Sequence, residues 1–167
     1  MPSTYNDIKI QLMATGENNT SWGDVTNVNW DAISEAVTGS ADVSFSGANV
    51  TLTLTNTNAT QSARNLRLNL TGTSGGARNL VVPTIEKLYL VNNGLADAVT
   101  VKTAAGTGIA VPAGKTMWVF ADGTDVVDVD TLFNVRVIAR AEPPDPTAEL
   151  QPQILIDKLD TSKKSHK

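Results

Sequence analysis

Residues 49–72 read NVTLTLTNTNATQSARNLRLNLTG, and the two ends of this stretch decide the fold class. In NVTLTLT and in RNLRLNL, apolar residues occupy every second position, and Thr, Asn or Arg occupy the positions between them. This period of two is typical of a strand that buries one face and exposes the other to solvent. We therefore expect one face of each strand to line a hydrophobic core, through Val50, Leu52 and Leu54 and through Leu66, Leu68 and Leu70.

The same period extends over residues 41–133, where about nine short apolar runs follow one another at close spacing. That pattern predicts an all-β fold, an antiparallel β-sandwich that is jelly-roll-like. Asn93-Gly94 and Asp122-Gly123 lie between apolar runs and predict two-residue hairpin turns. The similar runs ARNLR (63–67) and ARNLV (77–81) predict a further hairpin around the Gly-rich stretch between them.

Residues 1–40 form a compositionally separate N-terminal segment, rich in acidic residues and containing two of the three tryptophans. Within it, NVNWDAISEAVTG predicts a short helix that Asn29 caps and Gly39 ends. Trp30, Ile33 and Val37 fall on one face of that helix. A helix of about ten residues is marginal alone in water, so this face must dock on something.

Residues 134–167 break the strand pattern and predict an extended C-terminal arm, because AEPPDPTAELQP is rich in proline. The chain is therefore expected to consist of three parts, residues 1–40, 41–133 and 134–167. Inside the arm, the run ILIDKL is apolar and is expected to dock on the body or on another chain through Ile154, Leu155, Ile156 and Leu159.

Composition argues against several classes of function. The 167 residues include no cysteine and one histidine, His166, and the net charge is −4. We therefore expect no thiolate metal site, no nucleic-acid partner and no catalytic base. No apolar run approaches the roughly 20 residues of a membrane span, and the N-terminus lacks a secretory signal, so we expect a protein made in a cytoplasm with no membrane partner.

A group of aspartates provides the most plausible cation ligands, namely Asp122, Asp125, Asp128 and Asp130. Their spacing does not match a calcium-binding loop, and we expect a solvated hairpin there. The chain is accordingly predicted to be neither an enzyme nor a metalloprotein, and to bind no cofactor.

The run GENNTSWGDVTNVNW (16–30) with the helix after it resembles the N-terminal segment of bacteriophage tail-fibre and related virion structural proteins. The likeness continues through NATQSARNLRLNLTGT (58–73) and through residues 91–128, which resemble the β module of such proteins. It covers about residues 10–133. The resemblance implies a virion component that is made in a bacterial host, attaches to other virion structural proteins through its N-terminal segment, and is a homotrimer.

Carried over residue by residue, the attachment segment would contain Trp22, Gly23, Asn27, Asn29 and Trp30. Large apolar surfaces with one hydrogen-bond donor, such as tryptophans, are common at docking sites. An alternative is that both tryptophans cover the end of the chain's own sandwich. After Phe133 the sequence departs from the pattern of a long fibre, which leaves a short fibre, a fibre adaptor or a capsid-surface protein open. Our first hypothesis is a component of the tail fibre or of the baseplate periphery.

Two other functions remain open at this stage. One is a capsid decoration or head-fibre protein, whose arm would clamp neighbouring capsomers. The other, of a different class, is a module that binds host surface glycan, which would need exposed aromatic platforms. Most aromatic residues of the β region lie within apolar runs and are expected in the core, namely Phe45, Tyr89, Trp118, Phe120 and Phe133.

Overall fold

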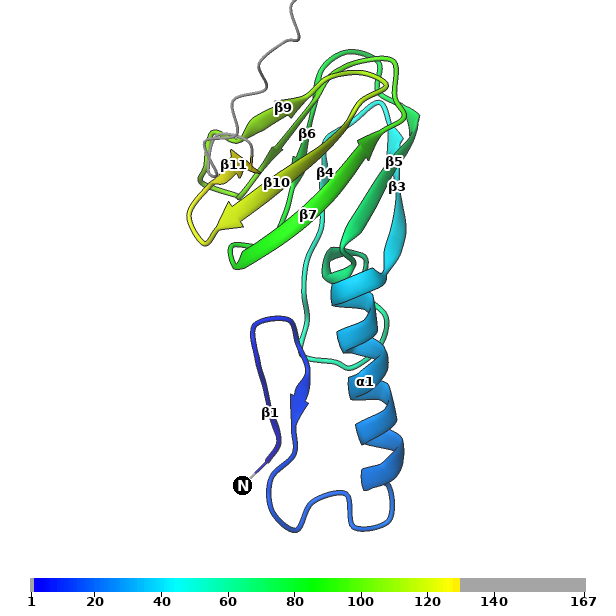
Figure 1. Ribbon diagram of the computed structural model, residues 1–167, viewed down its shortest axis with the longest axis vertical. Coiled ribbons are helices and arrows are strands. Elements are labelled where there is room, and N and C mark those ends of the chain that lie inside the picture. Colours follow the sequence, from blue (N-terminus) through cyan, green and yellow to red (C-terminus); the bar gives the residue numbers. More distant parts are fainter. Residues whose placement is uncertain (1, 130–167) are drawn as a thin grey trace, which may run out of the picture. The chain divides into compact units, whose positions relative to one another are not determined.

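The computed structural model describes residues 2–129, all of which belong to one unit of the chain (Figure 1). Most of these residues form β-strands, and one long helix precedes the main sheets. The predicted C-terminal arm, with Ile154, Leu155, Ile156 and Leu159, lies outside the described residues, as do Asp130, Phe133 and His166.

The elements begin with a small hairpin, β1 (Thr4–Tyr5) and β2 (Gln11–Leu12), followed by α1 (Trp22–Thr38). Nine strands and a short 3₁₀ helix, η1 (Ser62–Arg64), follow. The strands are β3 (Ser40–Ser46), β4 (Val50–Thr51), β5 (Arg67–Thr73), β6 (Arg78–Val81), β7 (Glu86–Asn93), β8 (Val99–Lys102), β9 (Ile109–Val111), β10 (Thr116–Asp122) and β11 (Val126–Asp128). Each of the nine predicted apolar runs therefore contains or overlaps a strand.

The strands from β3 to β8 form a two-sheet coil rather than an antiparallel sandwich. The chain alternates between a five-stranded sheet, β11-β10-β7-β5-β3, and a four-stranded sheet, β4-β6-β8-β9. Within the coil, β3, β5 and β7 are parallel neighbours, and so are β4, β6 and β8. A parallel pair needs a crossover, and here a strand of the opposite sheet provides it.

Only the end of the β region is antiparallel, because β9 pairs with β8, and β10 pairs with both β7 and β11. The prediction of a mostly β chain with an N-terminal helix is confirmed. The prediction of an antiparallel, jelly-roll-like sandwich is wrong, since the sheets mix parallel and antiparallel pairs. Alternation reports which face of a strand is buried and says nothing about the direction of its neighbour.

Two of the three predicted hairpins are wrong, because the strands on either side of each turn belong to different sheets. Asn93-Gly94 and the Gly-rich stretch at residues 74–77 both lead from one sheet into the other. The hairpin at β10 and β11 is confirmed, although its two-residue loop is Gly123-Thr124 and not Asp122-Gly123, since Asp122 N–H bonds to Asp125 O. Gly123 has a φ of 82°, which the first central residue of a type II′ turn requires.

The core lies between the two main sheets. Leu68, Leu70, Leu80, Val91 and Val101 are fully buried there. The core assignment is therefore confirmed for Leu68 and Leu70, whereas Leu66 is only partly buried. Val50, Leu52 and Leu54 are also only partly buried, because β4 is short and at a sheet edge. The two sheets bury enough apolar surface to make the β region the stable part of the described unit.

Helix α1 begins eight residues earlier than predicted. Its N-cap is Ser21, whose carbonyl accepts a bond from the Val25 N–H, so the prediction that Asn29 caps the helix is wrong. Gly39 ends it, as predicted. A Cβ at Gly39 would lie 2.6 Å from Glu35 Cα, so no larger residue fits where the helix turns into β3.

Candidate assembly surface

A buried arginine joins the N-terminal segment to the β region. The Arg64 side chain, on η1, is fully buried and forms an ion pair with Glu35 of α1 at 2.8 Å. It also donates to backbone carbonyls of the β1–β2 loop, at Ile8 and Lys9, and of the loop before η1, at Thr57 and Ala59. One side chain thus connects three separate segments, and η1 is itself held by a bond from Tyr89 Oη to Ala63 O.

A second polar clamp holds the β1–β2 hairpin against α1. The Asn29 amide donates to Gln11 O at 2.9 Å and accepts from Gln11 N–H at 3.1 Å. It also accepts from the amide of Asn58, on the loop that precedes η1. Asn29 was predicted as an attachment residue, and the structure places its amide inward, in contact with the hairpin.

The tryptophans of α1, unlike the Asn29 amide, are exposed to solvent. Trp22 and Trp30 are 62% and 63% exposed, and Val37 is 61% exposed. With Thr26 and the partly buried Ile33, they follow one another at intervals of four, four, three and four residues, which places them along one side of the helix. We call these five residues the α1 stripe. Because both tryptophans are exposed, they do not cover the end of the chain's own sheets.

Two further predicted residues adjoin the α1 stripe. Asn27 is exposed, and Gly23 has nothing within 4 Å of the position that a Cβ would take. Glycine is unfavourable in helices, so a helical glycine without a steric reason inside its own chain stands out. Gly23 is next to Trp22, where a partner could approach the backbone closely.

Sequence reasoning missed a second apolar surface, on the outer face of the five-stranded sheet. Trp118 was expected in the core but is 42% exposed, and Leu88 is 38% exposed. Register places Trp118 beside Leu90, and Phe120 beside both Leu88 and Val127. We call these five residues the sheet patch. The signal was present in the sequence, because LYLV (88–91) and MWVF (117–120) are apolar at consecutive positions and so must present apolar residues on both faces.

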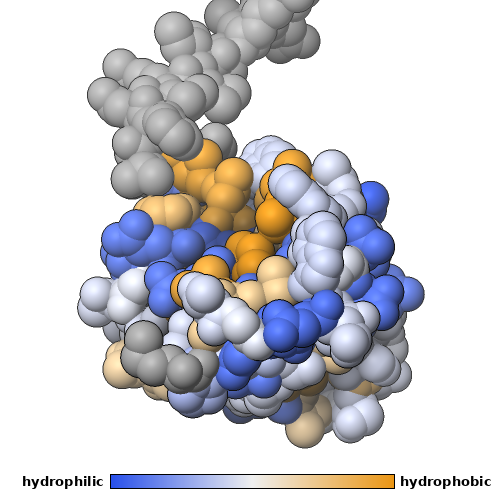
Figure 2. Space-filling view, turned by 90° about the horizontal axis from the view of Figure 1, so that it is seen from below, coloured by the Kyte–Doolittle hydropathy of each residue, from blue (hydrophilic) through white to orange (hydrophobic). Residues whose placement is uncertain are grey.

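The other half of the same outer face is polar. On β3 and β5 it presents Ser40, Asp42, Ser44, Arg67 and Asn69, and the Asn69 amide donates to Ser40 and Asp42. Figure 2 shows the same unevenness on another face, where hydrophobic residues gather in one region among hydrophilic ones. The exposed apolar surface is therefore concentrated, and concentrated apolar patches mark interaction sites.

A shallow cleft of about 290 Å³ lies between the hairpin, α1 and the loop before η1. Tyr5, Asp24, Val28 and Asn58 are among its lining residues. Asp24 is the only charged residue among the lining residues, and Tyr5 is the only other titratable one. The unpartnered oxygen of Asn58 is fully buried and out of reach of a ligand in the cleft.

The aspartates near the β10–β11 turn hold loops together. The Asp125 carboxylate accepts from the Thr107 hydroxyl and from the backbone N–H groups of Val126, Thr107 and Gly108, and these bonds lower its pKa to about 2. Asp122 accepts from the N–H groups of Thr124 and Asp125. Among residues 2–129 no group of three or more acidic or histidine side chains is arranged to hold a metal ion.

One buried cation lies inside the β region. Lys87 faces the interior of the sheet, with its Nζ 4.6 Å from the centre of the Tyr89 ring, and burial lowers its pKa to about 8. Burial also raises the pKa of the Tyr89 phenol. In the part of the chain that the structure describes, the Lys87 ammonium has no ion-pair partner. Lys87 and Leu88 alternate along β7, so the Lys87 side chain lies on the face opposite the sheet patch.

Comparisons with known proteins identify no relative, since no protein-family model, no curated protein and no solved structure matches the chain. Among residues 2–129, no helix has the length and apolar character that crossing a membrane requires. Function is therefore inferred from the sequence motifs and from the two exposed apolar surfaces.

Proposed function

We propose that this chain is a bacteriophage virion structural protein, a tail-fibre or baseplate-peripheral component that assembles as a homotrimer. It attaches to other virion structural proteins through its N-terminal segment. The resemblance of residues 16–30, 58–73 and 91–128 supports the class of protein. The observation that carries the assembly role is the α1 stripe, which leaves Trp22 and Trp30 more than 60% exposed.

The inward side of α1 already packs against other parts of the same chain. Ala32 is buried, Asn29 clamps the hairpin, and Glu35 pairs with Arg64. Covering a tryptophan side chain removes up to about 150–250 Å² of surface from water, which is the largest gain that any residue type offers. A helix that is held firmly on one side and exposes two such residues on another side is well arranged for docking.

Two alternatives use the same surfaces. A capsid decoration or head-fibre protein would also expose an assembly face, and its copy number in purified particles would reach hundreds where a fibre reaches tens. A host-glycan-binding module is favoured by one observation, the exposed indole of Trp118, because sugars stack on flat aromatic faces. It requires that Trp118→Ala abolish binding to host surface glycan and leave incorporation into particles intact.

The test of the proposed function is incorporation into particles. Trp30→Ala should lower the amount of the protein in purified virions by at least tenfold, because interface tryptophans contribute on the order of 2–4 kcal/mol. Asp31→Ala, at the next position and exposed away from the α1 stripe, is the matched control. Normal incorporation of Trp30→Ala, with a folded protein by circular dichroism, would remove the basis for the proposal.

A further inference from the structure

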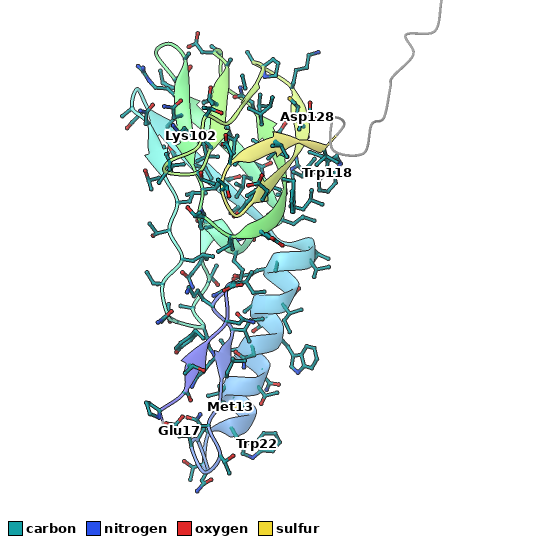
Figure 3. All side chains as sticks on the ribbon, turned by 90° about the vertical axis from the view of Figure 1, so that its left-hand side faces the viewer. Met13, Glu17, Trp22, Lys102, Trp118 and Asp128 are labelled. Carbon is teal, nitrogen blue, oxygen red and sulfur yellow. The ribbon has the colours of Figure 1, made fainter. Side chains whose placement is uncertain are left out.

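The two exposed apolar surfaces lie on one side of the described unit. In Figure 3, Trp22 of the α1 stripe and Trp118 of the sheet patch both point to the right-hand side of the view. The helix runs directly into β3 through Gly39, and Arg64 fixes it to the β region. A partner that lies alongside α1 and the five-stranded sheet can therefore contact both surfaces at once.

Neither surface is large enough alone for a stable interface. At about 150–250 Å² for a whole tryptophan, the three indoles leave on the order of 300 Å² uncovered. A specific interface buries about 800 Å² on each partner. Val37 and Leu88, which are 61% and 38% exposed, bring the total nearer to that size only if both surfaces face the same partner.

The charge pattern favours a second copy of this chain as that partner. The α1 stripe and the sheet patch consist of Trp, Thr, Ile, Val, Leu and Phe, and contain no charged residue. The acidic residues of α1, at Asp24, Asp31 and Glu35, lie at other positions around the helix. On the same face, the pair that follows Leu88 and Phe120 is Glu86 and Asp122, at the end of the patch. Copies packed through the stripe and the patch would bring no like charges together at the centre of the interface, and these two acidic residues would lie at its rim.

Gly23 supports close packing at the end of the stripe. The space beside its Cα is empty within the described residues, although an alanine there would favour the helix. A neighbouring helix that crosses at this point could approach the backbone directly. Close helix packing in an assembly would therefore explain the glycine at this position, which no contact within the isolated unit explains.

We propose that the α1 stripe and the sheet patch are two parts of one interface between copies of this chain, packed side by side with their α1 helices parallel. This inference rests on the homotrimer of the proposed function and specifies which surfaces form it. Trp30 then supports incorporation into particles by holding together the trimer that attaches. A rotation axis along α1 places the same residues of every copy at the same height. It therefore brings stripe against stripe and patch against patch.

The first experiment measures the mass of the isolated protein by sedimentation equilibrium. The wild type should have three times the chain mass of 17.6 kDa. Leu88→Arg adds a charge to the sheet patch and should lower the mass to that of one chain. Ser44→Arg adds the same charge to the polar half of the same face and should leave the trimer intact.

A wild-type mass of one chain at all concentrations would overturn the inference, and so would a trimer that Leu88→Arg does not weaken. A single-chain mass would also remove the homotrimer from the proposed function. It would leave the role as a virion structural protein, which incorporation of Trp30→Ala into particles tests separately. Conversely, trimers that assemble as described but are absent from virions would overturn the proposed function alone.

The second experiment needs no destabilising change and fixes the arrangement of the helices. Because the chain contains no cysteine, a single introduced cysteine reports only on contacts of its own position. Thr26→Cys, in the middle of the α1 stripe, should give covalently linked pairs with a short bis-maleimide. Asp31→Cys, on another side of α1, should not. Failure of Thr26→Cys to link, or equal linking at both positions, would exclude parallel packing through the stripe.

Discussion

The N-terminal segment and the β region are held together by different kinds of interaction. In the β region a continuous group of buried apolar residues lies between two hydrogen-bonded sheets. In the described part of the N-terminal segment, Ala32 is the only fully buried apolar residue, and polar contacts from Arg64 and Asn29 take the place of a core. The β region should therefore tolerate single changes, whereas the segment depends on a few side chains.

The largest expected loss of stability comes from Arg64→Met. It leaves Glu35 and four backbone carbonyls without their donor, and breaking a buried ion pair in this way costs about 3–5 kcal/mol. Hydrogen exchange should show loss of protection at Ile10 and Gln11, while Val91 and Val101 in the sheets stay protected. Arg67→Met, at an exposed position three residues on, is the control and should change stability by less than about 0.5 kcal/mol. An equal loss of protection in the N-terminal segment and in the sheets would contradict the conclusion that the segment depends on Arg64 more than the β region does.

A smaller effect is expected at the junction of the two regions. Gly39→Ala forces a Cβ against the Glu35 backbone and should lower the free energy of unfolding by about 2 kcal/mol, as overpacking does. Thermal or urea unfolding measures it. An unchanged free energy of unfolding for Gly39→Ala would mean that α1 and β3 can move apart without loss of stability.

Gly23→Ala is the contrasting change within the same helix. The space around Gly23 is open, so alanine should stabilise α1 by up to about 1 kcal/mol. If α1 helices pack as proposed, the same change should weaken the trimer at constant or improved stability of the single chain. Sedimentation at several concentrations, together with urea unfolding, separates the two effects.

The smallest expected effect concerns pH and belongs to the β region. The folded pKa of Asp125 is about 2, below its ordinary value of 3.8, chiefly because of the Thr107 hydroxyl and the Val126 N–H. A lowered pKa means that the stabilisation is complete above about pH 4 and is lost as pH falls toward 2. Asp125→Asn should therefore be less stable than the wild type at pH 7, and the difference should shrink between pH 4 and 2. A difference that is constant over this range would show that the carboxylate charge is not involved.

The sequence allowed prediction of the strands but not of their arrangement. Alternation in NVTLTLT and RNLRLNL identifies buried faces, and that local signal is the same for a parallel and an antiparallel neighbour. Gly94 and Gly75 also occur at chain reversals, yet each reversal leads to the opposite sheet. The parallel coil follows from contacts between residues far apart in the chain, such as Ser40 with Arg67 and Arg67 with Leu90.

The candidate surface was predicted in part. The exposure of Trp30 and Val37 on one side of α1 agrees with the predicted face. The prediction that Asn29 caps the helix is wrong. Asn is a common N-cap residue, and only the folded hairpin provides the Gln11 backbone that its amide binds. Trp118 was predicted to lie in the core because apolar runs are usually buried. The side of β10 on which its side chain lies depends on the strand register.

The coil of strands β3 to β8 also bears on how such a protein could change its length. Each turn of the coil contributes one strand to each sheet, and the turns stack at the spacing of neighbouring strands, about 4.8 Å. Insertion or loss of one turn would lengthen or shorten the β region by that step without altering the pattern of inward and outward residues. A gene that duplicates a segment such as β5 with β6 could thus adjust the reach of the protein in small, regular increments, while α1 and the β10–β11 hairpin remain as its two ends.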